Sequence, residues 1–412
     1  MTANAPPPQG PPVASTAGAG LGALPRFFIF YALLYAAFGA ASPFLPAFLS
    51  ERGVAPQELG LLLAASTAVR LISGPVAGRL ADLFQALRMV LCICTAGAAI
   101  VALCYLPAHG LWLLLLINLV HTAMIAPLPD VADALALRAA ARRPGGFEYG
   151  WVRGAGSAAF VVGSLIAGQL VGTIGFAVII GLHALALAAA VMAASILPET
   201  NRQALVPAQI EAGALRTLLG LPIFVRVVLI AALVLGSHAM LDAFAVVRWS
   251  AVGMSAATAS LLWSEAVAAE VVVFFVLGPR LLNLIGPSGA LALACSAGAL
   301  RWMIMGLTAN VVAMAMIQPL HGLTFALLHL ACMRLLSAAV PPALAATAQA
   351  LYHTVGVGLA SVALTLLSGW AYGEFGARAF WIMAAVCTLA LPVIWSLWRL
   401  LESERTKLLA SG

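Results

Sequence analysis

Several charged residues lie inside the long apolar stretches of this chain, away from most of the charges in its loops. A charge placed in hydrocarbon costs at least about 2.5 kcal/mol, so such residues usually face the interior of a helix bundle or a water-filled path, where they mark routes for ions and solutes. The pattern predicts a membrane protein that moves a solute. The residues concerned are Arg70, Asp130, Asp133, Arg153, Asp242, Glu265, Glu270 and Arg301.

Glu270, Arg301 and His321 are the residues best suited to handling a proton. Coupling to protons needs a carboxylate whose pKa changes as the protein opens and closes, and burial together with a movable arginine can supply that change. His321 can donate or accept a hydrogen bond according to its tautomer, so it is also a candidate contact for the solute. The alternative is a buried ion pair between Glu270 and Arg301 that only fixes helices together.

Asp130 and Asp133 lie three residues apart, after the bend expected in the segment APLPD, and share one face of a helix. Arg153 is expected to pair with them or to clamp a carboxylate of the solute with its planar fork of donors. A purely structural ion pair between the two helices is the alternative. His238 and Asp242, four residues apart, share a face of another helix. Asp242 is either an added proton site or a hydrogen-bond partner of His238.

The elements that position these residues are predicted to be membrane-spanning helices. Of 412 residues, 63% are hydrophobic and 8% are charged, and the mean hydropathy is +1.07. A soluble fold of this composition could not cover its surface with polar groups. A hydrocarbon core about 30 Å thick needs roughly 20 apolar residues per helix, which gives an all-α membrane protein with twelve spans. These are residues 27–49, 57–78, 88–106, 111–135, 149–172, 174–197, 222–247, 256–278, 288–309, 310–336, 345–370 and 376–400.

The spans divide into two halves of six. Residues 198–221 are the longest hydrophilic interruption, and we interpret them as a cytoplasmic linker between an N-terminal bundle, 26–197, and a C-terminal bundle, 222–400. GRLADLFQALRMVLCICTAGA from Gly78 weakly resembles GPRLLNLIGPSGALALACSAGA from Gly278. Two pseudo-symmetric bundles around a central site are how many secondary transporters achieve alternating access.

The basic residues predict the orientation. With both termini in the cytoplasm, fourteen Lys and Arg residues lie inside and only Arg52, Arg248 and Arg378 lie outside, which is strong positive-inside asymmetry. We expect residues 1–25 to be a disordered cytoplasmic tail and 401–412 to be a second cytoplasmic tail. The net charge of +6 then reflects topology, so no nucleic-acid partner is expected.

Several segments resemble a known family. Gly78, Arg79 and Asp82 in GRLAD, with Arg88 nearby, resemble the loop signature of the major facilitator superfamily, which helps to govern its conformational switch. SHAMLDAF, LLWSEAVAAEVVVF, ALRWMIMG and PLHGLTFALLHLACMRLL resemble the phenylpropionate permease family, and FEYGWVRGAGSAAFVVGSLIAG resembles both that family and the related lactose permease family. The resemblance covers most of residues 27–400 and implies the major facilitator fold.

The resemblance also implies roles for single residues. Glu270, Arg301 and His321 match the order of the carboxylate, Arg and His in helices 8, 9 and 10 of the lactose permease family, and Arg153 matches a substrate-facing Arg. Phe160 stands where that family carries a Trp that stacks on the sugar ring, which suits an apolar or aromatic ligand. Thr324 replaces the carboxylate that carries the proton, so coupling must fall on Glu270 or another acid, or be absent.

The remaining polar residues are given structural roles. Arg70 is expected near the cytoplasmic end of helix 2, where its side chain can reach the interface. The role of Glu265 is open. Polar groups on helices 10 and 11 are expected to make interhelical hydrogen bonds. These are Gln318, His329, Gln349, Tyr352 and His353.

Together these observations predict a proton-driven importer of a small organic solute, with aromatic acids such as 3-phenylpropionate as the class that the resemblance implies. Substrate contacts are expected from Arg153, Asp130, Asp133, Phe160, His238 and His321. A proton-antiport exporter and a non-transporting sensor of the same fold are the alternatives. No nucleophile with a base, no cofactor motif and no metal-ligand spacing occurs, so an enzyme is not expected. We expect a monomer in a bacterial inner membrane.

Overall fold

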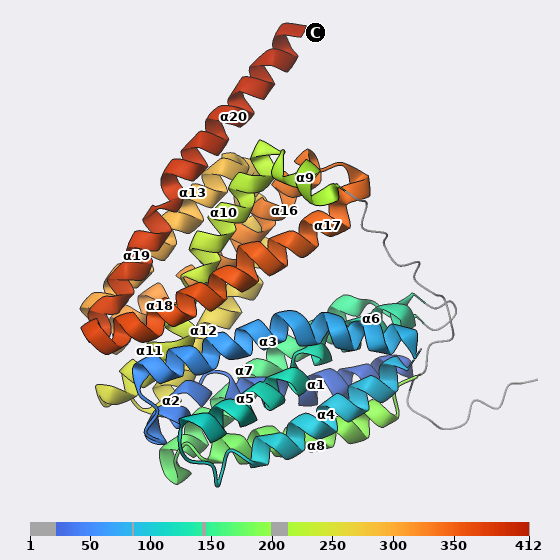
Figure 1. The fold of residues 1–412 in the computed structure, drawn as a ribbon, viewed down its shortest axis with the longest axis vertical. Helices are drawn as coiled ribbons and strands as arrows, with labels where there is room; N and C mark the ends of the chain where they lie inside the picture. The colour runs from blue at the N-terminus through green and yellow to red at the C-terminus, as the bar shows by residue number, and fades with distance from the viewer. Residues whose placement is uncertain (1–21, 85, 142–145, 199–212, 412) are drawn as a thin grey trace, which may run out of the picture.

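The computed structural model describes residues 22–84, 86–141, 146–198 and 213–411. Its N-terminal half is a bundle of helices (Figure 1), in which two of the predicted spans, 27–49 and 111–135, are each built from two consecutive helices. The helices are α1 (Ala23–Ala41), α2 (Leu45–Glu51), α3 (Pro56–Leu83), α4 (Leu87–Leu103), α5 (Leu111–Ile125), α6 (Pro127–Ala140), α7 (Tyr149–Ile174) and α8 (Val178–Ser195).

The C-terminal half is a second bundle, and three of its spans contain π-helical segments, written η1, η2 and η4. Its elements are α10 (Pro222–Gly236), α11 (Ala239–Ala251), α12 (Ala256–Val272), η1 (Val273–Leu277), α13 (Gly278–Leu307), α14 (Val311–Ile317), α15 (Leu320–Gly322), η2 (Leu323–Leu327), α16 (Leu328–Ala339), η3 (Pro342–Leu344), α17 (Ala345–Leu351), η4 (Tyr352–Leu359), α18 (Ala360–Phe375), η5 (Gly376–Ala379), α19 (Phe380–Thr388) and α20 (Ala390–Ser411).

Nine stretches of the described helices are long and apolar enough to cross a membrane. Two of them run through two crossings and are broken at Gly286 and Gly376, whose positive φ values of 70° and 55° favour glycine. Leu87–Leu103 is a further apolar helix, slightly shorter than the rest. The described helices are therefore consistent with twelve spans. The helix is interrupted in APLPD, where a bend was predicted, because α5 ends at Ile125 and α6 begins at Pro127.

The domain boundaries predicted from composition differ in detail. Residues 1–21 and 199–212 lie outside the described residues, so the predicted tail and most of the linker are not described. Helix α1 begins at Ala23, inside the predicted tail, and α9 (Ala214–Leu219) lies inside the predicted linker. Helix α20 continues to Ser411 because no proline or glycine interrupts the polar sequence after residue 400.

The two bundles pack against each other at one end of the molecule and as far as the contact of Leu71 on α3 with Gly358 on η4. We call the end where Pro198 and Gly213 adjoin the linker the linker end, and the opposite end the far end. At the far end α3 packs on α18 so closely that a Cβ on Gly60 would lie 2.7 Å from the Cα of Gly369. Toward the linker end the bundles diverge (Figure 1).

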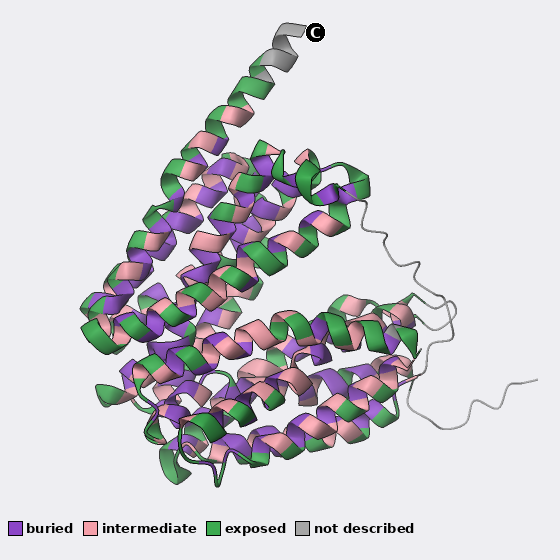
Figure 2. Ribbon diagram, viewed as in Figure 1, coloured by how far each residue is buried: buried purple, intermediate pink, exposed green. Residues whose placement is uncertain are grey.

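The buried apolar residues show the same asymmetry. One cluster is confined to the linker end of the N-terminal bundle and includes Phe27, Leu91 and Leu135. The other fills the C-terminal bundle and continues into the far end of the N-terminal bundle through Phe44 and Phe48. Buried residues occur in the helices of both bundles (Figure 2). Among the described residues, the bundles share an apolar core at the far end and have separate cores at the linker end.

Candidate functional site

Arg301 is the centre of a polar group inside the C-terminal bundle. Its side chain is fully buried. One terminal nitrogen, Nη1, lies 3.0 Å from Nδ1 of His321, and Nη2 donates to the amide oxygen of Gln318. Its Nε is buried with no hydrogen-bond partner among the described residues. Arginine can only donate, so Nδ1 of His321 must be the acceptor and the ring proton of neutral His321 must lie on Nε2.

That Nε2 faces Glu270. It lies 3.7 Å from Oε2 of the carboxylate, and the two side chains are 15% and 33% exposed. His321 therefore lies between Arg301 and Glu270, and the alternative of a direct ion pair between those two residues is wrong for this conformation. The arrangement can hold a proton between Nε2 and the carboxylate, and the bond from Arg301 keeps Nδ1 of His321 unprotonated.

His238 contacts protein groups instead of facing the space between the bundles. Its side chain is 6% exposed. Nδ1 lies 3.1 Å from the carbonyl oxygen of Val234, and Nε2 lies 2.9 Å from Oγ1 of Thr324. In this conformation His238 is enclosed by protein, with its ring against Thr324 and His321, so its predicted contact with the solute stays a prediction.

Arg153, in contrast, is exposed on the N-terminal bundle. Its guanidinium lies over the ring of Tyr35, 4.7 Å from the centroid. No ion pair joins it to Asp130 or Asp133 in the described part of the chain, so the predicted pairing of these helices is wrong. Asp133 instead accepts a hydrogen bond at Oδ1 from the hydroxyl of Tyr31. Arg153 is thus supported by an aromatic face, and among the described residues it forms no ion pair, while its charge acts on the carboxylate of Glu270 in the C-terminal bundle.

The other two predicted substrate contacts differ in their surroundings. Asp130 is exposed, and its Oδ2 would lie 3.6 Å from a Cβ on Gly74 of α3. Phe160 is half-buried and packs against the apolar core of the N-terminal bundle. The aromatic ring that is available near the proton group is Phe325, which is 41% exposed and stacked on His321 with 5.6 Å between centroids. Sequence reasoning missed Phe325, although its position four residues after His321 places it on the same helical face.

Charges of the two bundles also act on each other away from this group, without forming an ion pair among the described residues. The charge of Asp242 on α11 interacts with those of Arg301 and of Arg70 on α3, and both Asp242 and Arg70 are exposed. Arg70 lies in the middle of α3, so its predicted place near the end of helix 2 is wrong. The prediction failed because the helix runs on to Leu83, beyond the expected limit at residue 78.

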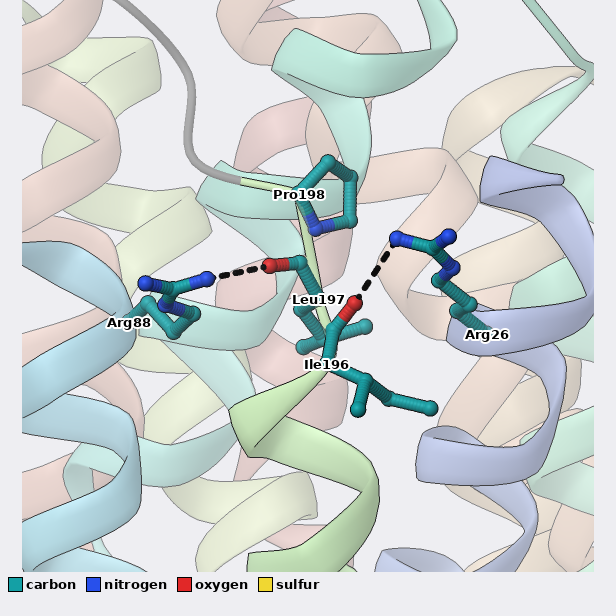
Figure 3. Close-up of a pocket in the computed structure, with 5 residues that line it drawn as sticks. All are labelled: Arg26, Arg88, Ile196, Leu197 and Pro198. Atoms are coloured by element: carbon teal, nitrogen blue, oxygen red, sulfur yellow. Dashed lines mark hydrogen bonds between the residues drawn. The ribbon is translucent and has the colours of Figure 1, made fainter. Parts of the chain in front are cut away.

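Because α3 is longer than predicted, most of the predicted gating loop is helical. Gly78, Arg79 and Asp82 lie in the last turns of α3, and Arg88 lies in the first turn of α4. Arg88 donates from Nη1 to the carbonyl oxygen of Leu197 at 3.1 Å, and Arg26 donates to that of Ile196 at 3.1 Å (Figure 3). The two arginines bind the carbonyl oxygens that follow α8, beside a cavity of about 440 Å³. In this conformation they therefore join α1 and α4 to the end of α8 within the N-terminal bundle.

Comparison with known proteins agrees with this architecture. The family model described as MFS_1 like family matches residues 24–383. The chain belongs to that family. It is a transporter of the major facilitator superfamily, a multi-pass membrane protein and not an enzyme.

Two curated relatives are similar over almost their whole length. The chain is 32% identical over 368 residues to the probable 3-phenylpropionic acid transporter of Escherichia coli (strain K12), which covers 88% of this chain and 94% of the relative. It is 27% identical over 382 residues to the maltose permease of Geobacillus stearothermophilus, covering 92% and 95%.

Solved structures show the same fold. The nucleoside transporter NupG superposes with a TM-score of 0.78 over 92% of this chain and 99% of that one, at 16% identity. A D-xylose-proton symporter gives a TM-score of 0.66 over 91% and 98%, at 14% identity. At these identities the similarity establishes the fold alone, so substrate and coupling must be argued from the site.

Proposed function

We propose that this transporter imports a small aromatic carboxylate together with a proton. The observation that carries the proposal is the position of His321, with its Nε2 toward Glu270 and its Nδ1 bonded to Arg301. The membrane would be a bacterial inner membrane, with both termini and the linker end in the cytoplasm and the protein acting as a monomer. The described conformation is then open to the inside.

The proton site would work by exchange of partners. While Arg301 donates to Nδ1 of His321, that nitrogen cannot bind a proton. When helix movement separates them, His321 can become an imidazolium that pairs with Glu270, or Glu270 can take the proton itself. A movement of the bundles thus changes how tightly the group holds one proton, which is what coupling requires.

The solute site would lie between Arg153 and Phe325. Arg153 offers an exposed guanidinium that suits a carboxylate, and Phe325 with the ring of His321 offers an aromatic surface. The similarity to the probable 3-phenylpropionic acid transporter supports an acid that carries one ring and one carboxylate. Arg153 lies in the N-terminal bundle and Phe325 in the C-terminal bundle, so such a solute would bridge the two halves.

The test is the pH outside de-energised cells that express the protein, recorded when 3-phenylpropionate, maltose or a nucleoside is added. Alkalinisation by 3-phenylpropionate, lost in Glu270→Gln and kept in Glu265→Gln, is the expected result. Glu265 lies on the same helix α12, so its variant controls for the loss of a carboxylate as such. Acidification would mean antiport and export. Silence with correctly folded protein would mean facilitation or a sensor.

A further inference from the structure

Two histidines lie between Glu270 and the linker end and have no part in the site described so far. His329 is the second residue of α16, and His353 is the second residue of η4. Their ring centroids are 6.1 Å apart, and the ring of Tyr352 lies 6.0 Å from His329 and 5.1 Å from His353. In the described part of the chain neither histidine makes a hydrogen bond. The predicted interhelical bonds of these two residues are therefore absent there.

Each histidine has a carboxylate as its neighbour of opposite charge. Glu270 attracts a positive charge on His329, and Asp130 attracts one on His353. The other titratable groups close to this line are His321 and Arg153 beside Glu270, Tyr352 beside both rings, Cys332 on α16, and Asp133 one helical turn beyond Asp130. The order Glu270, His329, His353, Asp130 thus places two bases between two acids, from the centre of the C-terminal bundle to the exposed face of the N-terminal bundle.

Helix α3 contacts both η4, which carries His353, and the side chain of Asp130. Gly358 of η4 packs against the side chain of Leu71, and Asp130 lies against Gly74, one turn further along α3. A single turn of α3 therefore touches both the segment that carries His353 and the carboxylate of Asp130.

The π-helical segments change which side chains share one face of a helix. His321 and His329 are eight residues apart, which on a regular α-helix would turn them about 80° from each other. The π-helical η2 lies between them, and because a π turn takes up an additional residue, the separation counts as roughly seven residues, or two turns. The other two segments begin three residues after Glu270 and at Tyr352. All three adjoin the titratable groups.

We propose that His329, His353 and Asp130 form the path by which the proton leaves Glu270 toward the linker end. This rests on the proposed function. The protonated Glu270 gives its proton through bridging water to a ring nitrogen of His329, and the other ring nitrogen releases a proton through one bridging water to His353. His353 passes a proton in the same way to Asp130, which is exposed and releases it to bulk water. Rotation of each ring restores the starting tautomer.

The experiment uses the full-length protein in proteoliposomes, with 3-phenylpropionate as the probe. Two quantities are measured for His329→Gln and His353→Gln: proton flux on addition of the probe, and counterflow of labelled probe, which needs no net release of the proton. The path predicts a loss of proton flux of at least about tenfold with counterflow kept within about twofold. The control is His109→Gln, at an exposed position in the far-end loop.

Two results would overturn the path. Wild-type proton flux in both variants would show that the histidines carry no proton. An equal loss of flux and counterflow would show that they only support the fold. A wild-type protein that moves no proton with 3-phenylpropionate contradicts the proposed function instead, and the path is then judged by a measurement without solute.

That measurement is the infrared band of the protonated Glu270 carboxyl, assigned by its loss in Glu270→Gln. Its appearance is followed after a pH jump on the linker side. The path predicts an appearance several times slower in His329→Gln than in wild type. An unchanged rate would mean that water reaches Glu270 directly, and the path would be wrong.

Discussion

The hydroxyl of Thr324 lies 2.9 Å from Nε2 of His238 and 3.1 Å from the carbonyl oxygen of His321. A hydroxyl has one proton to donate. Nδ1 of His238 faces carbonyl oxygens, which only accept, so in neutral His238 the acceptor is Nε2 and Thr324 must donate to it. While it does so, that proton is not available to the carbonyl oxygen of His321, so the two contacts of the hydroxyl exclude each other.

Replacing Thr324 by Val should leave Nε2 of His238 buried without a donor. An unsatisfied buried group of this kind costs about 1 to 3 kcal/mol, so we expect a lower midpoint of thermal unfolding for the purified protein. Thr324→Ser keeps the hydroxyl and is the control. Equal midpoints for the Val and Ser variants would show that the bond contributes nothing to stability.

Arg301→Lys should uncouple transport without unfolding the bundle. A lysine keeps the charge but cannot donate to His321 and Gln318 at the same time from a planar fork. We expect proton-driven accumulation of 3-phenylpropionate to fall by about tenfold or more while counterflow survives. Gln318→Glu, which keeps an acceptor for Arg301, is the comparison. Full accumulation in Arg301→Lys would remove Arg301 from the coupling group.

Arg153→Gln should reduce the preference of the transporter for the acid 3-phenylpropionate over its neutral amide. A charge-assisted hydrogen bond is worth about 1.5 to 3 kcal/mol, so the half-saturation concentration for 3-phenylpropionate should rise at least about tenfold. The neutral 3-phenylpropionamide should be affected much less. The readout is competition by each compound against labelled acid. If acid and amide weaken equally, Arg153 supports the fold of the site and does not bind the carboxylate.

Uptake should depend on the pH of the far side with a definite sign. A proton must bind Glu270 from that side before import, so raising the outer pH at constant inner pH should lower the initial rate of uptake. Glu270→Gln should flatten the dependence, and Glu265→Gln should keep it. Vesicles without protein correct for passive entry of the uncharged acid. A rate that rises with outer pH would point to antiport.

Gly60→Ala should open the far end. The added Cβ would meet backbone atoms of Gly369 at 2.7 Å, which no rotamer change can relieve. Spin labels at Ala55 and Phe375, in a background with the native cysteines replaced, should report a longer distance across the far end. Gly172→Ala is the matched control because its Cβ meets no atom within 4 Å. Identical distances in the two variants would contradict this account of the closed end.

The sequence alone was enough to predict the helices and the group of Glu270, Arg301 and His321. Hydropathy locates the membrane spans because each crossing needs a long apolar run. Charged residues inside such runs are rare, so they indicate functional sites. What faces each charge could not be predicted. Tyr35 under Arg153 and Thr324 beside His238 depend on how separate helices rotate against one another, and the π-helical turns shift those rotations without any mark in the hydropathy pattern.

The apolar core that both bundles share at the far end has a consequence for turnover. Opening that end must bring water onto surfaces that are dry in this conformation, so each cycle includes a hydration step. Solutes excluded from the protein surface make hydration of apolar area more costly. Osmotic stress applied on the far side should therefore slow the return of the empty carrier, and the number of waters taken up per cycle can be obtained from that slope.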